Sequence, residues 1–229
     1  MKSFVFPSML ILALVAGCDN KPTEGKAQAT VGEPVTTAPS ASAPPAASSA
    51  PAASAAPAAK GEVLAISPSN SKVEFVGAKF SGKHEGKFEK FEGEVELVDG
   101  KPEGSAVKVS IELASVNTGE QMLDDHLKKA DFFDVAQFAK ATFESTEIKA
   151  DKGAKGETHS VTGNFDLHGV KKSITFPATI TVTADKVSAK AEFGINRLDF
   201  GVKYEGKKND LIKNDVLIKL DLELPRAKK

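Results

Sequence analysis

The feature that most constrains the fold of this chain is an alternation of apolar and polar residues with a period of two. Between Val216 and Leu224, every second residue is valine, isoleucine or leucine, and three of the four intervening residues are charged. This pattern predicts a strand with one buried and one exposed face. Similar patterns predict about eight strands, over Val73–Phe80, Phe91–Leu97, Val107–Leu113, Thr142–Lys149, Val161–Leu167, Ser173–Thr183, Val187–Ile195 and Val216–Leu224.

Antiparallel strands with one polar face have to close on themselves or pack as a sandwich. Glycine inside a strand commonly marks a bulge or a bend at a barrel corner. Five glycines interrupt the strand patterns: Gly77, Gly86, Gly93, Gly163 and Gly194. Several such bends favour a curved, closed sheet over a flat one. We therefore predict an all-β fold, an antiparallel barrel of about eight strands.

One segment departs from the period of two and predicts a short helix from Thr118 to about Ala130. Thr118 and Gln121 fit a capping box, with Thr118 as the N-cap residue and Gln121 three positions later. Asp125 and Lys129 are four residues apart and are expected to pair in solvent. A helix inserted among strands is well placed to cover a barrel mouth.

The apolar residues of this helix and of the turn after it are expected to face the sheet. Two pairs are spaced by four residues, Leu123 with Leu127 and Met122 with His126. Phe132 and Phe133 follow, and Asp131 is expected to cap the turn that carries them. Asp124 and Asp125 would then keep the outer face of the helix soluble. The segment is interpreted as an apolar lid with a polar outer face.

Groups for catalysis or metal binding are sparse. The four histidines, His84, His126, His159 and His168, do not have metal-ligand spacing, and there is no nucleophile elbow or phosphate-binding loop. Neighbouring helix residues do not face each other, so Asp124, Asp125 and His126 do not form a catalytic group. We predict no enzymatic activity, no metal and no cofactor. His126 is expected to be partly buried and hydrogen-bonded, with ligand contact as the alternative.

Two observations narrow the partners of the β-domain. Residues 61–229 carry 26 basic and 28 acidic side chains, which are interspersed, so nucleic-acid binding is not expected. Twelve of the 14 phenylalanines also lie there. A phenylalanine-rich inner face is either a packed core or the wall of a cavity, because an eight-stranded barrel can hold one elongated ligand.

The amino-terminal residues predict export to the cell envelope. Phe4–Ala16 is an apolar run too short to span a bilayer, and Leu14–Cys18 resembles the lipobox of bacterial lipoproteins, in which the cysteine is acylated. We predict a signal peptide over residues 1–17 and lipid attachment at Cys18. The barrel would then be anchored to a membrane, with the domain in the periplasm.

A linker is expected between this anchor and the domain. Residues 38–59 contain only alanine, proline and serine, which cannot build a core. We predict that residues 18–60 form a disordered tether and that residues 61–229 form one domain.

Six motifs are spread in order over about residues 62–225. They are Lys72–Phe75, Leu123–Val135, Ala141–Ser145, Val161–Lys172, Asn196–Gly201 and Asp215–Leu220. Together they resemble the YceI-like family. The resemblance implies a lipocalin-like barrel in the periplasm with a long apolar cavity for polyisoprenoid or isoprenoid-quinone chains. Leu123 departs from the family, whose members often have arginine there.

The resemblance favours a lipid cavity over a filled core, so we predict a membrane-anchored lipid-binding protein for carriage or sequestration. A filled barrel that binds proteins is the alternative, and an enzyme acting on such lipids is a third. An elongated ligand would also be consistent with a homodimer. The candidate wall residues are Phe80, Phe91, Ile111, Leu123, Leu127, Phe132, Phe133, Phe143, Phe165, Phe193 and Phe200. The candidate polar contacts are His126, Asn196 and Arg197.

Overall fold

The structure is a computed structural model that describes residues 21–35 and 61–226. The predicted signal peptide, Cys18 and the stretch 38–59 lie outside the described residues. Thus the predictions of lipid attachment and of a disordered stretch at 38–59 stay predictions.

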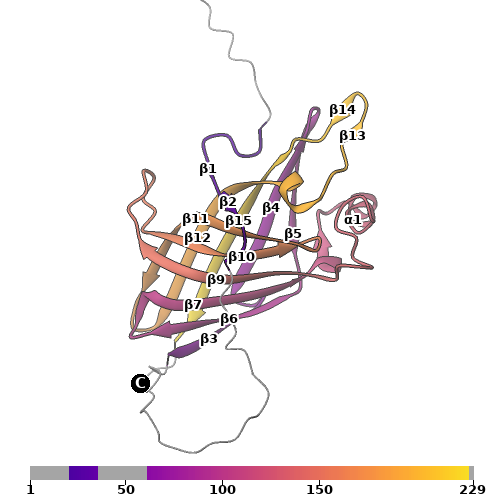
Figure 1. Cartoon of the computed structure of the whole chain (residues 1–229). Helices are drawn as coiled ribbons and strands as arrows, with labels where there is room; N and C mark the ends of the chain where they lie inside the picture. Colours follow the sequence, from indigo (N-terminus) through magenta and orange to yellow (C-terminus); the bar gives the residue numbers. More distant parts are fainter. Residues whose placement is uncertain (1–20, 36–60, 227–229) are drawn as a thin grey trace, which may run out of the picture.

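The described chain forms one strongly curled sheet (Figure 1). Its hydrogen-bonded order is β3-β6-β7-β9-β10-β11-β12-β15-β4-β5-β8, and neighbours along this path are antiparallel. The strands are β3 (Glu62–Ile66), β4 (Ser71–Lys79), β5 (Gly82–Phe88), β6 (Phe91–Val98), β7 (Lys101–Glu112), β8 (Val116–Asn117), β9 (Lys140–Ala150), β10 (His159–Leu167), β11 (Val170–Val182), β12 (Lys186–Asn196) and β15 (Asp215–Pro225). The predicted all-β antiparallel class is confirmed. The path ends at β3 and β8, so the sheet curls around its core as a half-barrel.

All eight predicted segments form strands, namely β4, β6, β7, β9, β10, β11, β12 and β15. The alternation of residues predicts neither β3 nor β5. β5 reads Gly-Lys-His-Glu-Gly-Lys-Phe, in which one large apolar side chain cannot display a period of two. It is a strand because its backbone pairs with β4 over Glu74–Lys79.

The helical elements are short. They are α1 (Gln121–Leu127), η1 (Leu113–Ser115) and η2 (Arg197–Phe200). A separate two-stranded hairpin of β13 (Gly206–Lys207) and β14 (Asp210–Leu211) lies at the same end of the molecule as the tip of β4 and β5 (Figure 1). In the described part of the chain, none of these helices is long and apolar enough to cross a bilayer.

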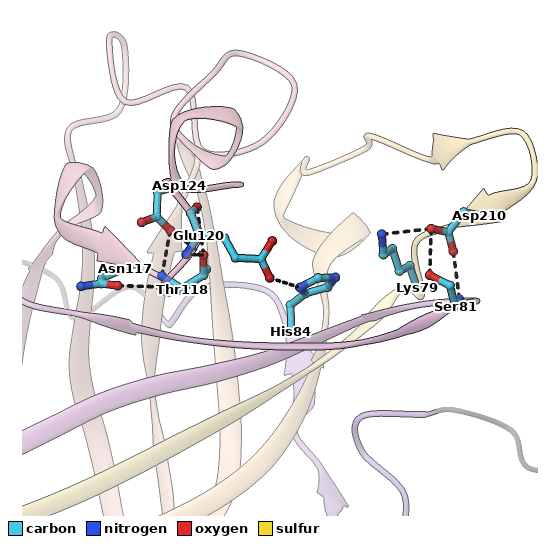
Figure 2. Close-up of polar contacts among 9 residues, drawn as sticks. Lys79, Ser81, His84, Asn117, Thr118, Glu120, Asp124 and Asp210 are labelled. Carbon is cyan, nitrogen blue, oxygen red and sulfur yellow. Dashed lines mark hydrogen bonds and ion pairs between the residues drawn. The ribbon is translucent and has the colours of Figure 1, made fainter. Parts of the chain in front are cut away.

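The predicted helix from Thr118 to Ala130 is too long, and its cap is wrong. α1 begins after Glu120, whose side chain makes no capping hydrogen bond. Thr118 instead donates from its backbone N–H and its hydroxyl to Oδ1 of Asp124, at 2.8 and 2.7 Å (Figure 2). Asp124 is therefore buried, not part of a soluble outer face. The carboxylate ties the segment before the helix to the helix itself.

Two further expectations about α1 are corrected by the structure. Met122 is 87% exposed and does not face the sheet, because a helix of two turns presents only a narrow face inward. Asp125 accepts a hydrogen bond from Nε2 of Gln121, the residue one turn earlier, in place of the predicted pair with Lys129.

The segment Lys21–Val35, which we call the strap, is part of the sheet. Its strand β1 (Ala27–Gln28) pairs in parallel with β12, and β2 (Thr30–Gly32) pairs antiparallel with β11. β11 and β12 pair with each other only over Thr179–Val182. Beyond that point they diverge, and the strap occupies the hydrogen-bonding edges of both (Figure 1). The prediction of a disordered linker over 18–60 is wrong for this segment.

Side chains also hold the strap on the sheet. Asn164 accepts from the backbone N–H of Val35 at 2.9 Å and donates to its carbonyl at 2.8 Å. Lys172 pairs with Glu33 at 3.1 Å. Ala29 and Val31 pack against the core. The composition of the strap does not predict its two strands, because the strands with which it pairs lie more than 100 residues away in the sequence.

The core lies inside the curl, on the apolar face of each long strand. One predicted glycine bulge is confirmed at Gly163, where the register between β9 and β10 shifts. A Cβ at Gly163 would lie 2.6 Å from the carbonyl oxygen of Glu144 and 2.5 Å from the ring of Phe143. Only glycine allows β9 and β10 to approach this closely.

Candidate ligand cavity

The curled sheet encloses a cavity of about 250 Å³. Side chains of β3, β4, β5, β7, β9, β10, β11, β12 and β15 line it, and the segment that begins with α1 contributes Leu127, Phe132 and Phe133. Four lining residues lack an apolar side chain: Glu74, Gly77, Lys190 and Arg197. A wall of this kind can bind an aliphatic chain by burial of apolar surface, without a charged contact.

Seven of the eleven candidate wall residues line this cavity. They are Ile111, Leu127, Phe132, Phe133, Phe143, Phe165 and Phe193. They come from β7, from α1 and the turn after it, and from β9, β10 and β12, so only the tertiary structure brings them together. Their contact with a ligand stays a prediction.

The other four candidates lie elsewhere. Phe80 lies on the opposite phase from Val73, Phe75 and Gly77, which line the cavity. It is 77% exposed because it follows the end of β4, at the tip of β4 and β5. Phe91 and Phe200 are buried in the core outside the cavity lining, and Leu123 packs in a smaller cluster beneath α1. Periodicity identifies buried faces but does not distinguish filled from empty space.

Three aromatic lining residues are absent from the candidate set: Phe75, Phe88 and Phe176. The rings of Phe88 and Phe133 are 5.9 Å apart, so Phe88 connects the sheet to the turn after α1. Phe176 stacks on Phe193 at 4.1 Å. Phe75 lies two residues after Val73 and Phe176 two residues after Ile174, so each pair shares one face of its strand. This alternation could have identified both phenylalanines as wall residues.

A tight turn after α1 places the aromatic residues against the sheet. The N–H of Phe133 donates to the carbonyl of Leu127, and that of Val135 to the carbonyl of Lys128, at 3.0 and 3.2 Å. Leu127 and Phe132 are buried together with Val202. The segment therefore has the geometry expected of an apolar lid. The carboxylate of Asp131 contacts His126, and in the described residues it accepts no hydrogen bond from a backbone N–H, so the prediction that it caps the turn is wrong.

Arg197 is buried at the end of β12 with its guanidinium bonded to the main chain. It donates to the carbonyl oxygens of Val202 at 2.6 Å, Lys213 at 3.1 Å and Ile212 at 3.4 Å. Burial lowers the pKa of Arg197 from its ordinary value, and the charge of Glu205 opposes this shift. Arg197 thus fixes residues 202–213 beside the cavity.

The remaining polar candidates are engaged by neighbouring residues. Nε2 of His126 lies 2.8 Å from Oδ2 of Asp131, and its ring contacts Phe132 and Tyr204 edge-on, each at 5.0 Å. Oδ1 of Asn196 accepts the N–H of Leu198 and caps η2. His126 is half-buried and hydrogen-bonded, as expected. Neither residue is part of the cavity lining, so ligand contact, the alternative for His126 and the candidate role of Asn196, is not supported by their position.

The part of the chain that the structure describes also contains no cluster of metal-ligating side chains. No three histidine, cysteine, aspartate or glutamate side chains lie close enough together there to hold an ion. The prediction that the protein is not an enzyme stays a prediction.

Comparison with protein families identifies the domain. The profile of the YceI-like domain matches residues 64–224, which is more than half of the chain. The chain belongs to the YceI-like family. A UPF0312 protein of Pseudomonas putida strain W619 is 32% identical over 153 residues, which cover 64% of this chain and 77% of that protein.

Solved structures share the YceI-like fold. BcnA of Burkholderia cenocepacia is 28% identical, with a TM-score of 0.60 over 67% of this chain and 95% of its own. A polyisoprenoid binding domain from Saccharophagus degradans, implicated in plant cell wall breakdown, has a TM-score of 0.58 at 18% identity, over 73% and 99% of the two chains. The second likeness shows the fold alone.

Leu123 stands where members of the YceI-like family often have arginine, and this difference has little consequence for the cavity. Leu123 packs beside Leu127 and Phe132 in the cluster beneath α1. An arginine there would not replace any residue of the cavity lining.

Proposed function

We propose that this protein is a membrane-anchored lipid-binding protein that holds the isoprenoid chain of a polyisoprenoid or quinone inside the curled sheet, for carriage or sequestration. The observation that carries the proposal is the cavity wall, in which 31 of the 35 lining residues have apolar side chains. The YceI-like family and the likeness to a polyisoprenoid binding domain support the choice of ligand.

The cavity volume sets the length of chain that can be enclosed. A cavity of about 150 Å³ holds benzene, with six carbon atoms. At the same density, 250 Å³ holds a segment of about ten carbon atoms, or two isoprene units. At about 0.8 kcal/mol for each buried carbon, the transfer term is about 8 kcal/mol before the entropy of association is subtracted. A longer isoprenoid would have to project through the mouth or widen the cavity.

The strap changes the expected relation between the anchor and the domain. Cys18 precedes Lys21 by three residues, which span at most about 10 Å. Acylation of Cys18 would therefore hold the strap, and with it β11 and β12, close to the bilayer. Residues 38–59 connect β2 to β3 in the chain and would not set this distance.

Mass spectrometry of lipids extracted from the natively purified protein tests the ligand. We expect a long-chain isoprenoid to be recovered from the wild-type protein and from Val63→Asp, whose side chain is exposed on β3. We expect it to be lost from Phe165→Asp, which places a charge in the cavity wall.

Two results would contradict the lipid-binding proposal. One is repeated absence of any long-chain lipid together with no binding of added quinone or polyprenol. The other is unchanged binding by a folded Phe165→Asp protein, which would favour the filled-barrel alternative. The intact mass of the membrane fraction, compared with that of Cys18→Ser, tests the anchor separately.

A further inference from the structure

Two hairpin tips form a single bonded unit at one end of the molecule. We call residues 79–84 and 203–213 the tip surface; it contains the turn between β4 and β5 and the hairpin of β13 and β14 (Figure 1). Asp210 accepts the N–H and hydroxyl of Ser81 at 2.9 and 3.0 Å and pairs with Lys79 at 3.0 Å (Figure 2). The Ser81 N–H is the main cause that lowers the pKa of Asp210. The carboxylate therefore stays charged at neutral pH and holds the two tips together.

Large apolar side chains project from the tip surface. Phe80 is 77% exposed and Leu211 is 53% exposed. The N–H of Phe80 donates to the carbonyl of Leu211 at 3.0 Å, so the two residues are neighbours across the hairpins. An aromatic ring that is held in solvent by a fixed backbone contributes little to the stability of the monomer, and such groups often mark a docking site.

The tip surface is also strongly basic. Its two segments contain six lysines and two carboxylates, a formal net charge of +4, whereas the whole chain carries −1. The lysines are Lys79, Lys83, Lys203, Lys207, Lys208 and Lys213. Lys83, Lys207 and Lys208 make no ion pair with any residue that the structure describes. Glu120 lies at the edge, where Oε1 is 3.6 Å from Nδ1 of His84 (Figure 2).

The same elements continue into the cavity wall. Gly77 lines the cavity two positions before Lys79 on β4, and Ile212 lines it directly after Leu211. Lys79 and Ile212 also form an isolated β-bridge. The exposed apolar side chains therefore stand beside the part of the cavity that β4 and residues 202–213 enclose.

We propose that the tip surface docks on an anionic lipid bilayer, with Phe80 and Leu211 in the headgroup region and the surrounding lysines on lipid phosphates. An aromatic residue flanked by lysines has the chemistry of an interfacial membrane contact, and positive charge is attracted to an anionic leaflet. The proposal rests on the proposed function, since docking would bring the cavity to the source of its lipid.

Fluorescence provides a direct test, because the chain has no tryptophan. Phe80→Trp introduces a single indole at the tip, and Val63→Trp introduces one at an exposed position on β3, at the opposite end in Figure 1. Each full-length variant is mixed with vesicles of phosphatidylglycerol and phosphatidylcholine, or of phosphatidylcholine alone, that contain brominated acyl chains. We expect a blue shift and quenching only for F80W with the anionic vesicles.

The lysines are tested in the F80W background. Each lysine near an anionic surface contributes about fivefold to membrane partitioning, so Lys207→Gln with Lys208→Gln is expected to weaken vesicle binding by at least about tenfold. The matched control is Lys101→Gln with Lys152→Gln, two exposed lysines outside the tip surface, which should change binding less than threefold.

Three outcomes would overturn membrane docking by the tip surface: equal emission changes for F80W and V63W, equal quenching with neutral and anionic vesicles, or equal effects of the two lysine pairs. The proposed function fails by a different observation, the absence of an isoprenoid in lipid extracts. A protein that contains the lipid but shows no F80W quenching refutes only the docking surface. Quenching without any cavity lipid refutes only the lipid cargo.

Discussion

Replacing Gly77 with phenylalanine should fill the cavity without disturbing the sheet. Gly77 lies on the inward phase of β4, it lines the cavity, and a Cβ there would have no heavy atom within 4 Å. A benzene-sized ring needs about 150 Å³, which would leave about 100 Å³ of the 250 Å³ cavity. Space for about six of ten enclosed carbon atoms would be lost.

The loss of binding follows from the carbon count. Six carbons at about 0.8 kcal/mol each set an upper limit of about 5 kcal/mol, and repacking that recovers half of the space would leave about 2 kcal/mol. Because 1.4 kcal/mol is a factor of ten, Gly77→Phe should weaken binding of a ten-carbon isoprenoid alcohol by at least about 30-fold. Titration calorimetry measures this change. The ring should also raise thermal stability, as cavity-filling substitutions do.

Gly32→Phe is the matched control for this experiment. Gly32 lies on β2 of the strap, also has no atom within 4 Å of an added Cβ, and is exposed outside the cavity lining. It should leave binding within about threefold of the wild-type value. A folded Gly77→Phe protein that binds as tightly as the control would refute the assignment of the cavity as the ligand site.

Other substitutions test how the wall of the cavity is held. Arg197→Met leaves buried carbonyl oxygens without a donor and should lower the free energy of unfolding by about 3 kcal/mol, which corresponds to a fall in Tm of about 6–12 °C. A fall in Tm of less than about 2 °C would contradict the role of the guanidinium. Gly194→Val places a Cβ 2.4 Å from Oε1 of Gln28 and should displace that side-chain amide from its hydrogen bond with Thr23. Hydrogen exchange at Ala29, whose N–H donates to the carbonyl of residue 194, should then accelerate while β12 and β15 stay protected. Unchanged exchange would argue that this side chain does not help to hold the strap on β12. Asp124→Ala removes the acceptor of both Thr118 hydrogen bonds and should lower the free energy of unfolding, measured by thermal melting, by about 1–2 kcal/mol. The control Asp125→Ala, at an exposed position, should lower it by less than about 0.5 kcal/mol. Equal effects of the two substitutions would refute the role of the Thr118–Asp124 contact.

The long strands could be predicted because their signal is local. In β15 and β7 the alternation itself specifies which side chains share a face, whatever the partner strands are. β5 and the strap carry no such signal, since their conformation depends on pairing with β4 and with β11 and β12. Their formation is a property of the assembled sheet.

The candidate site was predictable to a smaller extent. Phe143, Phe165 and Phe193 line the cavity as expected, whereas Phe80 lies outside because one position of strand phase reverses the face. The partners of Arg197 are main-chain carbonyls between residues 202 and 213, and main-chain acceptors leave no trace in side-chain patterns. Asp124 likewise looks like a surface charge until Thr118 is placed beside it.

The sequence by itself determined an all-β chain with a phenylalanine-rich inner face, a short helix in one connection and the YceI-like motifs, because period, composition and motif are local properties. The tertiary structure decided that the inner faces stay apart around a cavity of about 250 Å³, that the strap joins the sheet between β11 and β12, and that Phe80 and Leu211 meet at an exposed tip. The physical reason is that curvature comes from pairing between distant strands, and the space inside a curled sheet depends on that curvature and not on the alternation of its residues.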